Sequence, residues 1–189
     1  ATVTVHKSLP GLQSPAAGFE APFDMLEACH ERVHRMLALL ARLQAHVQIN
    51  GHDVQAQQAA QDVMRYFDLA APLHHQDEEL HVFPPLLAGG DVALVGAVQQ
   101  LMAQHRAMEQ AWTVMRQVLI QIAAHGSSAS AQTSTSVPCA ALTADAVRAF
   151  VALYEAHIRT EEGVAYPAAK GLLPPERLQS IGEDMMVRR

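Results

Sequence analysis

The residues best suited to chemistry are histidines and glutamates that recur four positions apart. Two distant segments, His74 to Pro84 and His157 to Pro167, share the pattern H-x3-E-E-x3-[F/Y]-P. Each follows a segment with a second four-residue pair, so the sequence predicts two copies of one helix pair. The four pairs are His30 with His34, His74 with Glu78, His105 with Glu109, and His157 with Glu161.

Four-residue spacing places two side chains on one face of an α-helix, because it adds a rotation of about 40° and a rise of about 6 Å. Four inward-facing pairs supply eight ligand candidates, His30, His34, His74, Glu78, His105, Glu109, His157 and Glu161. Histidine nitrogens mixed with carboxylates suit iron, manganese or zinc, and a carboxylate can bridge two ions. Burying these carboxylates without a cation is costly. The pattern therefore predicts a two-metal centre.

The residues beside these candidates have weaker spacing. Glu79 and Glu162 lie about 100° further round their helices and are expected to face solvent or a neighbouring helix. A one-residue bulge would swing Glu162 inward, so whether it replaces Glu161 stays open. We expect His75 to face outward or to support a ligand. His81, seven residues after His74, is expected to line the pocket or support a ligand.

Helical periodicity and end signals predict an all-α fold, an antiparallel four-helix up-and-down bundle. A proline inside the second helix, Pro72, should bend or divide it. A short C-terminal helix is expected to begin at Pro174-Pro175. The four long helices are expected from Phe23 to Asn50-Gly51, from Asp53 to Pro84-Pro85, from Asp91 to Gly126, and from Thr143 to Pro167.

The chain is long enough for one core and is predicted to be a single bundle with tails. Residues 1–22 carry proline and glycine without periodicity and predict an irregular N-terminal lead-in. The bundle is expected over 23–170, with a polar Ser/Thr-rich linker at about 126–142. Residues 171–189 form the expected C-terminal helical tail.

Composition argues against several partners. Thirteen basic and nineteen acidic residues leave a net charge of −6 without a basic patch, which disfavours nucleic-acid binding. The apolar stretches are too short for a membrane span, and the N-terminus lacks a signal-peptide pattern. Two cysteines do not indicate a disulfide framework, which fits a reducing cytoplasm.

Four motifs resemble those of the hemerythrin-like, or HHE cation-binding, family: CHERVH, HHQDEELHVFP, QHRAME and HIRTEEGVAYP. The resemblance spans about residues 23–170. It implies a non-haem centre of two iron ions, with Glu78 and Glu161 as carboxylate bridges. It also implies terminal histidines at His30, His74, His105 and His157. Manganese and zinc are the alternatives for the metal.

This chain differs from the oxygen-carrying members that it resembles. Glu109 stands where those members place a second histidine of the third helix, and His34 is additional. If both bind, three terminal side chains, two bridging carboxylates and a solvent-derived bridge fill six positions on each iron. That ligand set argues against reversible oxygen carriage. Whether both residues bind is left open by the spacing.

The resemblance favours a protein that senses or handles a small diatomic gas or peroxide, namely dioxygen, peroxide or nitric oxide. One alternative is a di-iron peroxidase or catalase-like enzyme in which His81 or Glu79 transfers protons. Others are iron storage or delivery, and a structural bundle whose histidines bind nothing. The sequence does not separate sensor from enzyme, and it leaves open a homodimer or a protein partner.

Overall fold

The computed structural model describes residues 21–124 and 141–188. The predicted lead-in at 1–22 and the predicted linker at about 126–142 therefore lie almost wholly outside the described residues. Within the described ranges every secondary-structure element is helical, which confirms the predicted all-α class. None of the helices in these ranges has both the length and the apolar character needed to cross a membrane.

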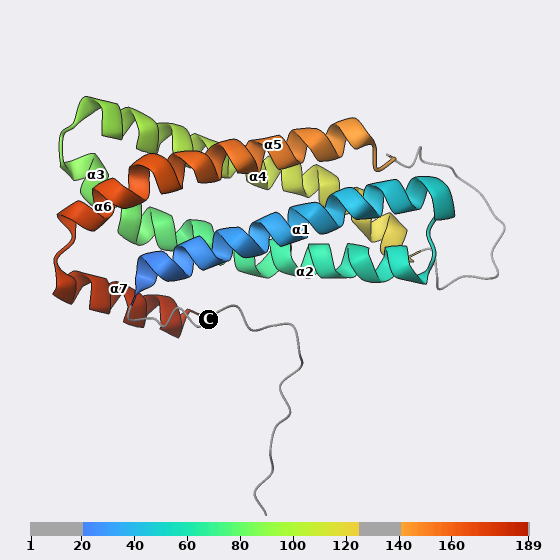
Figure 1. Ribbon diagram of the computed structural model, residues 1–189, viewed down its shortest axis with the longest axis horizontal. Helices are drawn as coiled ribbons and strands as arrows, with labels where there is room; N and C mark the ends of the chain where they lie inside the picture. The colour runs from blue at the N-terminus through green and yellow to red at the C-terminus, as the bar shows by residue number, and fades with distance from the viewer. Residues whose placement is uncertain (1–20, 125–140, 189) are drawn as a thin grey trace, which may run out of the picture.

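Four long helices form the body of the molecule, and Figure 1 shows them lying side by side in alternating directions. They are α1 (Pro22–Asn50), α2 (Val54–Asp77), α4 (Val92–Ala124) and α5 (Ala144–Thr160). Helix α1 packs against α2 and α5, and α4 packs against the same two helices. Each helix thus has two neighbours around a central core, as predicted for an up-and-down bundle.

Three helices begin next to residues at which the sequence predicted a helix start, and each of these residues caps its helix with its side chain. The Asp53 carboxylate accepts a hydrogen bond from the Ala56 amide at 2.9 Å, and the Thr143 hydroxyl accepts one from the Ala146 amide at 3.2 Å. Asp91 accepts two amide hydrogen bonds at the start of α4. Such caps satisfy amide groups that have no partner within the first turn.

Two of the predicted helix ends are wrong. Helix α2 continues through a π-helical turn, η1 (Glu78–Val82), into α3 (Phe83–Ala88) instead of stopping near Pro84-Pro85. Helix α5 likewise continues through η3 (Glu161–Ala165) into α6 (Tyr166–Leu172) beyond Pro167. Both copies of the repeated motif therefore contain a π turn at the same place.

The prolines explain these turns. A proline ring crowds the carbonyl four residues earlier and cannot donate a backbone hydrogen bond, and a wider π turn relieves the clash. In η1 the Phe83 amide donates to the Glu78 carbonyl, and in η3 the Tyr166 amide donates to the Glu161 carbonyl. The proline that follows then occupies the first turn of a new helix, where no donor is needed. Pro72 does not divide α2.

The C-terminal helix α7 (Pro175–Val187) begins where the sequence predicted and packs against α1 (Figure 1). The residue after it, Arg188, donates to the buried Asp77 carboxylate at 2.6 Å. Since Asp77 directly precedes η1, this ion pair joins the end of the chain to the π turn of the first motif.

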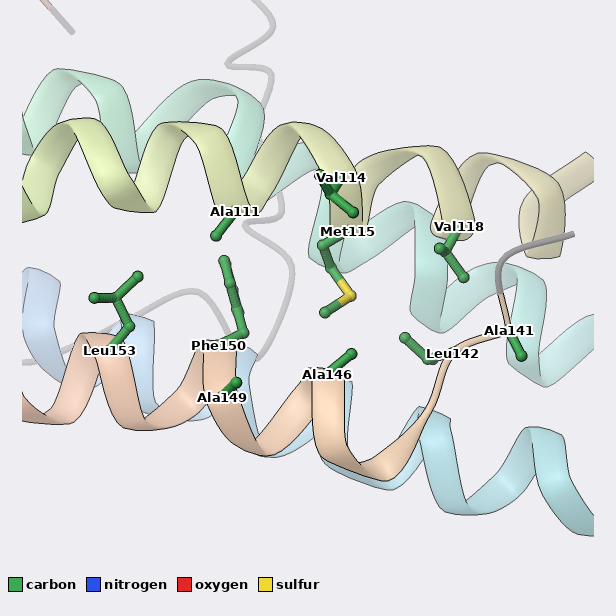
Figure 2. A pocket seen from close by; sticks show the side chains of 10 residues that line it. All are labelled: Ala111, Val114, Met115, Val118, Ala141, Leu142, Ala146, Ala149, Phe150 and Leu153. Atoms are coloured by element: carbon green, nitrogen blue, oxygen red, sulfur yellow. The ribbon is translucent and has the colours of Figure 1, made fainter.

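An apolar pocket of about 520 Å³ lies between α4 and α5. Figure 2 shows that the ten side chains lining it come from alanine, valine, methionine, leucine and phenylalanine. Examples are Met115, Val118 and Phe150. None of the lining residues can ligate a metal through nitrogen or oxygen, so this pocket is separate from the predicted chemistry.

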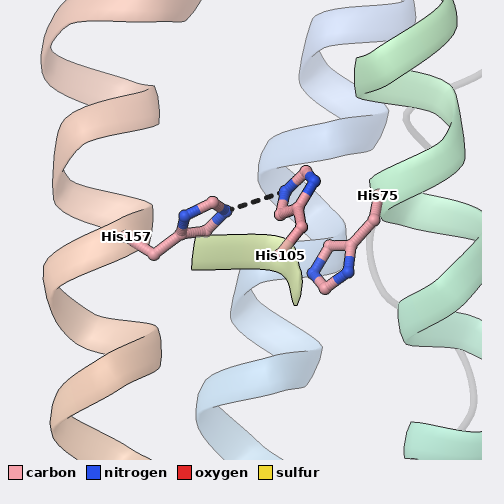
Figure 3. Close-up of side chains that lie close together, drawn as sticks. All are labelled: His75, His105 and His157. Carbon is pink, nitrogen blue, oxygen red and sulfur yellow. Dashed lines mark hydrogen bonds between the residues drawn. The ribbon is translucent and has the colours of Figure 1, made fainter. Parts of the chain in front are cut away.

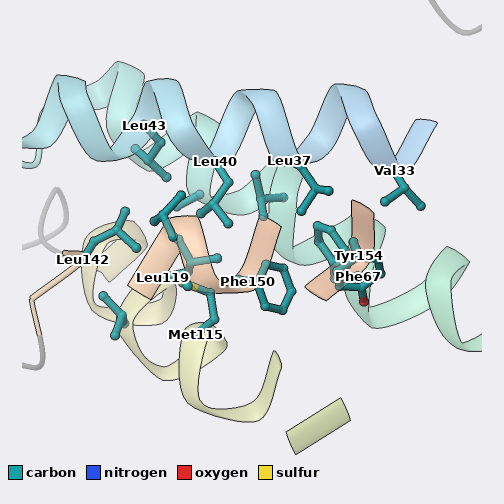
Figure 4. Packing of buried hydrophobic residues seen from close by; sticks show 14 of the residues in the cluster. Val33, Leu37, Leu40, Leu43, Phe67, Met115, Leu119, Leu142, Phe150 and Tyr154 are labelled. Carbon is teal, nitrogen blue, oxygen red and sulfur yellow. The ribbon is translucent and has the colours of Figure 1, made fainter. Parts of the chain in front are cut away.

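The core consists of two apolar clusters. The larger one includes Val33, Leu40 and Phe67, and Figure 4 shows its side chains filling the space among the four long helices. The smaller one includes Leu26 and Leu101 and lies under α3, α6 and α7. The buried ligand candidates lie where the two clusters meet: His30 on α1 and His105 on α4 fall between residues of the smaller and the larger cluster.

Candidate metal centre

Six of the eight ligand candidates converge inside the bundle, and each is at most 3% exposed. The helices α1 and α4 each contribute one histidine. Helix α2 with η1, and α5 with η3, each contribute a histidine and a glutamate. The six are His30, His74, Glu78, His105, His157 and Glu161.

These residues form two overlapping groups that share both glutamates. Within each group the ligand atoms all lie within 4.8 Å of one another. One group contains the His30–His74 pair and the other contains the His105–His157 pair; Glu78 and Glu161 belong to both. The arrangement therefore offers two adjacent metal positions with two carboxylates in common.

The two oxygens of Glu78 face different histidines. Its Oε1 lies 3.4 Å from Nε2 of His74, and its Oε2 lies 3.3 Å from Nε2 of His105. Because these histidines belong to different groups, one oxygen is available to each metal position. This is the geometry that a bridging carboxylate requires.

Glu161 spans the two groups in the same way. Its Oε2 lies 3.2 Å from Nε2 of His30, and its Oε1 lies 2.7 Å from Nε2 of His157. The two glutamates come from equivalent places in the repeated motif, at the first residue of each π turn. The duplication in sequence thus gives a near-symmetric pair of carboxylates, each of which faces both groups.

The glutamate after each bridge holds a histidine from a neighbouring helix. Glu79 accepts from Nδ1 of His105 at 2.9 Å, and Glu162 accepts from Nδ1 of His30 at 2.8 Å. We expected these glutamates to face either solvent or a neighbouring helix. The structure shows that both contact a neighbouring helix. In a π turn successive residues rotate by less than the about 100° of an α-helix, so each of these partly exposed glutamates still reaches the buried ring of a neighbouring helix. Glu162 does not replace Glu161 in the group.

These outer contacts determine which nitrogen faces inward. A neutral imidazole that donates through Nδ1 keeps its lone pair on Nε2. His157 is held in the same sense, since its Nδ1 lies 2.9 Å from Oε1 of Gln104. Three inward-facing nitrogen lone pairs therefore point at carboxylate oxygens, which are also acceptors. Such a set is satisfied by a cation or by extra protons.

Several inner atoms have no hydrogen-bond partner within the described part of the chain. They are both ring nitrogens of His74, Oε2 of Glu78 and both carboxylate oxygens of Glu161. Buried polar atoms of native proteins are almost always paired. This unpaired set consists of nitrogen and oxygen ligands aimed at one small volume, so the residues fit a metal site.

The pKa values of these groups are shifted because the groups are buried close to one another. Burial and the charge of Glu161 raise the pKa of Glu78 to about 8. Burial also opposes ionisation of Glu161, but the adjacent rings of His105, His157 and His30 hold its pKa well below the usual range. Burial opposes the charged form of His105, yet Glu161 and Glu78 raise its pKa to about 10. A metal ion that bound here would compete with protons for these groups.

His75 packs against the group through the ring of His105. Its ring stacks on His105 with centroids 4.0 Å apart and an interplanar angle of 14°. Figure 3 shows His105 between His75 and His157, with Nε2 of His105 and Nε2 of His157 3.1 Å apart. Burial and the neighbouring histidines lower the pKa of His75 well below its usual value, so its ring is neutral. Of the two orientations expected, the structure shows the supporting one.

His34 and Glu109 do not join the group, which corrects the expectation that all four pairs converge. Both are exposed at the bundle surface. On α1 the buried face passes from His30 through Val33 and Leu37, three and seven residues later, so the fourth residue falls on its outer side. The predicted six filled positions per ion therefore do not apply, because each group supplies four side chains.

His81 does not line the group either. Its Nε2 lies 2.7 Å from Oδ2 of Asp184 on α7. The seven-residue return to the face of His74 assumed an unbroken α-helix, and the π turn η1 changes that register. The histidine instead takes part in the contacts that hold α7 to the bundle.

A family model for the hemerythrin HHE cation binding domain matches residues 21–169. The chain belongs to this family. It is also similar to an uncharacterized protein of Haemophilus influenzae, with 26% identity over 173 residues that make up 92% of each chain. The range matched to the hemerythrin HHE domain contains all six converging residues and ends within α6, so α7 lies outside it.

For this hemerythrin HHE domain we expect the His34→Ala, Glu109→Ala double variant to bind as many metal ions as the unmodified chain. Surface substitutions away from a site change free energies by about 0.5 kcal/mol or less, or roughly twofold in affinity. Metal analysis after dialysis, with chelator competition, measures this. Loss of an ion in this variant, with a comparable loss in His30→Ala, would restore the two residues as ligands.

Proposed function

We propose that this chain is a non-haem di-iron protein that senses or handles dioxygen, peroxide or nitric oxide. One observation carries the proposal: Glu78 and Glu161 each direct one oxygen to the His30–His74 pair and the other to the His105–His157 pair. Membership of a cation-binding family supports a metal at this place.

The donor set fits iron. Each position has two imidazole nitrogens and two carboxylate oxygens, a mixture that suits iron, manganese or zinc. Helical bundles hold di-iron pairs on inward-facing glutamates and histidines of this kind. The four side chains of each group would hold one ion. An iron pair would supply one-electron redox chemistry there.

The surrounding residues keep water away from the group and orient its histidines. The two apolar clusters exclude water from both ends of the group, which strengthens its electrostatic interactions. Glu79 and Glu162 orient His105 and His30 and increase the basicity of their inner nitrogens. Their side chains are 36% and 45% exposed, so each links a buried ring to the surface of the bundle.

A small, partly open pocket lies beside the supporting residue His75. It has a volume of about 40 Å³ and lies between α2, α4 and α5, with His75 among its lining residues. A volume of this order holds one water-sized molecule. Most of the other lining side chains are apolar, including Phe67, Met108 and Trp112. None of the six converging residues lines this pocket, and the exposed Glu109 does, so the pocket lies beside the group and not within it.

Metal analysis combined with optical spectra of the reduced protein tests this function. We expect two irons per chain and a spectrum that changes on addition of air, peroxide or nitric oxide. A reversible oxygenated spectrum would instead indicate oxygen carriage, and destruction of peroxide over many turnovers would indicate the enzyme alternative. Labile iron passed to an acceptor would indicate storage or delivery. Protein that takes up no metal from iron-supplemented medium would overturn the proposal.

A further inference from the structure

The repeated motif makes the two halves of the centre nearly equivalent. Each π turn is followed directly by an aromatic residue that packs on the histidine held by the second glutamate of the same turn. Phe83 lies against His105, with ring centroids 5.6 Å apart and 29° between the planes. Tyr166 stacks on His30, with centroids 5.5 Å apart and 11° between the planes.

The hydroxyl of Tyr166 breaks this symmetry. Tyr166 is fully buried, and its hydroxyl donates a short hydrogen bond to Oε1 of Glu78. The same hydroxyl lies 3.2 Å from Nε2 of His30. Both contacted atoms face the His30–His74 position. Phe83, at the equivalent place beside His105, has no hydroxyl.

The bridging carboxylates are consequently held differently. All four of their oxygens face histidine nitrogens, but Oε1 of Glu78 also receives a hydroxyl hydrogen bond, which the other three lack in the described residues. A hydrogen bond to a charged carboxylate is stronger than one between neutral groups, and it holds that oxygen in one place. Glu161 has no comparable hydroxyl partner in the described residues.

We propose that Tyr166 is a positioning residue that makes the two metal positions unequal, by fixing Oε1 of Glu78 in place for the His30–His74 position. The inference rests on the proposed two-metal centre. Tyr166 acts through the ligands Glu78 and His30, and the His105–His157 position lacks an equivalent residue. The ion in the His30–His74 position is therefore the one whose binding depends on this hydroxyl.

Cobalt(II) binding to Tyr166→Phe tests the assignment without using iron redox activity. We expect two ions still to bind, with one stepwise dissociation constant raised about 10- to 100-fold, the usual cost of removing an outer partner of a metal ligand. The visible spectrum of that cobalt should change, while the melting temperature of the metal-free protein stays close to that of the unmodified chain. Tyr154→Phe, which removes another buried hydroxyl outside the group, should leave both constants unchanged.

Double variants identify the affected position. In a His157→Ala background the ion that remains is expected at the His30–His74 position, and adding Tyr166→Phe should weaken it. In a His74→Ala background the addition of Tyr166→Phe should have little effect on the remaining ion.

Equal weakening of the binding of both ions, or no weakening, would overturn the inference. A tyrosinate charge-transfer band in the ferric protein would also overturn it, because Tyr166 would then bind metal directly. Failure of the unmodified chain to bind two cobalt ions would instead contradict the proposed two-metal centre.

Discussion

Replacing Glu161 with glutamine should remove both metal ions, whereas replacing a single histidine should weaken one. Glu161 directs one oxygen to His30 and the other to His157, so its loss removes a ligand from both positions. The effect on each dissociation constant should exceed the about 10- to 100-fold that loss of an outer partner costs. We expect fewer than one bound ion per chain after dialysis, measured by elemental analysis.

Glutamine keeps the volume of the side chain, so this loss is not expected to come from unfolding. Glu155→Gln on the exposed face of α5 is the matched control for charge and should retain both ions. His74→Ala should retain about one ion, because the His105–His157 group keeps all four of its donors. If Glu161→Gln and His74→Ala lose the same single ion, Glu161 serves one position and the carboxylates do not bridge.

The helices were predictable because their signals are local. Apolar spacing marked the buried faces, and Asp53, Asp91 and Thr143 marked three of the starts, which the structure confirms. The predicted stops at Pro84 and Pro167 failed because a proline can end a helix or occupy the first turn of the next one. Only the packed structure shows that a π turn joins the two segments.

The site was predictable where the complete motif occurs. His74 with Glu78, and His157 with Glu161, come together in the structure, and both pairs precede an aromatic-proline dipeptide. No aromatic-proline dipeptide follows the pair of His30 and His34. This pair lies on an unbroken α-helix, where His34 faces outward.

Geometry that depends on the π turn could not be read from spacing. Glu79 and Glu162 reach histidines of neighbouring helices only because the turn is wider than an α-helix. The hydroxyl of Tyr166 was visible in sequence as the one difference from Phe83 at the end of the motif. Its partner Glu78 is 88 residues away, and tertiary packing determines that contact.

Removing the metal should lower the melting temperature by roughly 8–16 °C, because a ligand at about 1,000 times its dissociation constant stabilises the native state by about 4 kcal/mol. The carboxylates of Glu78 and Glu161 have no exposed surface, and without a cation they must hold protons or repel each other. Scanning calorimetry before and after chelation measures the shift. The difference in melting temperature should become smaller as the pH falls, because protons compete with the metal for the same atoms.

The Glu161→Gln variant cannot retain the ions, so its melting temperature should not respond to the chelator. An equal melting temperature for the metal-loaded and metal-free forms of the unmodified chain would mean that the buried group does not bind the ions that were removed.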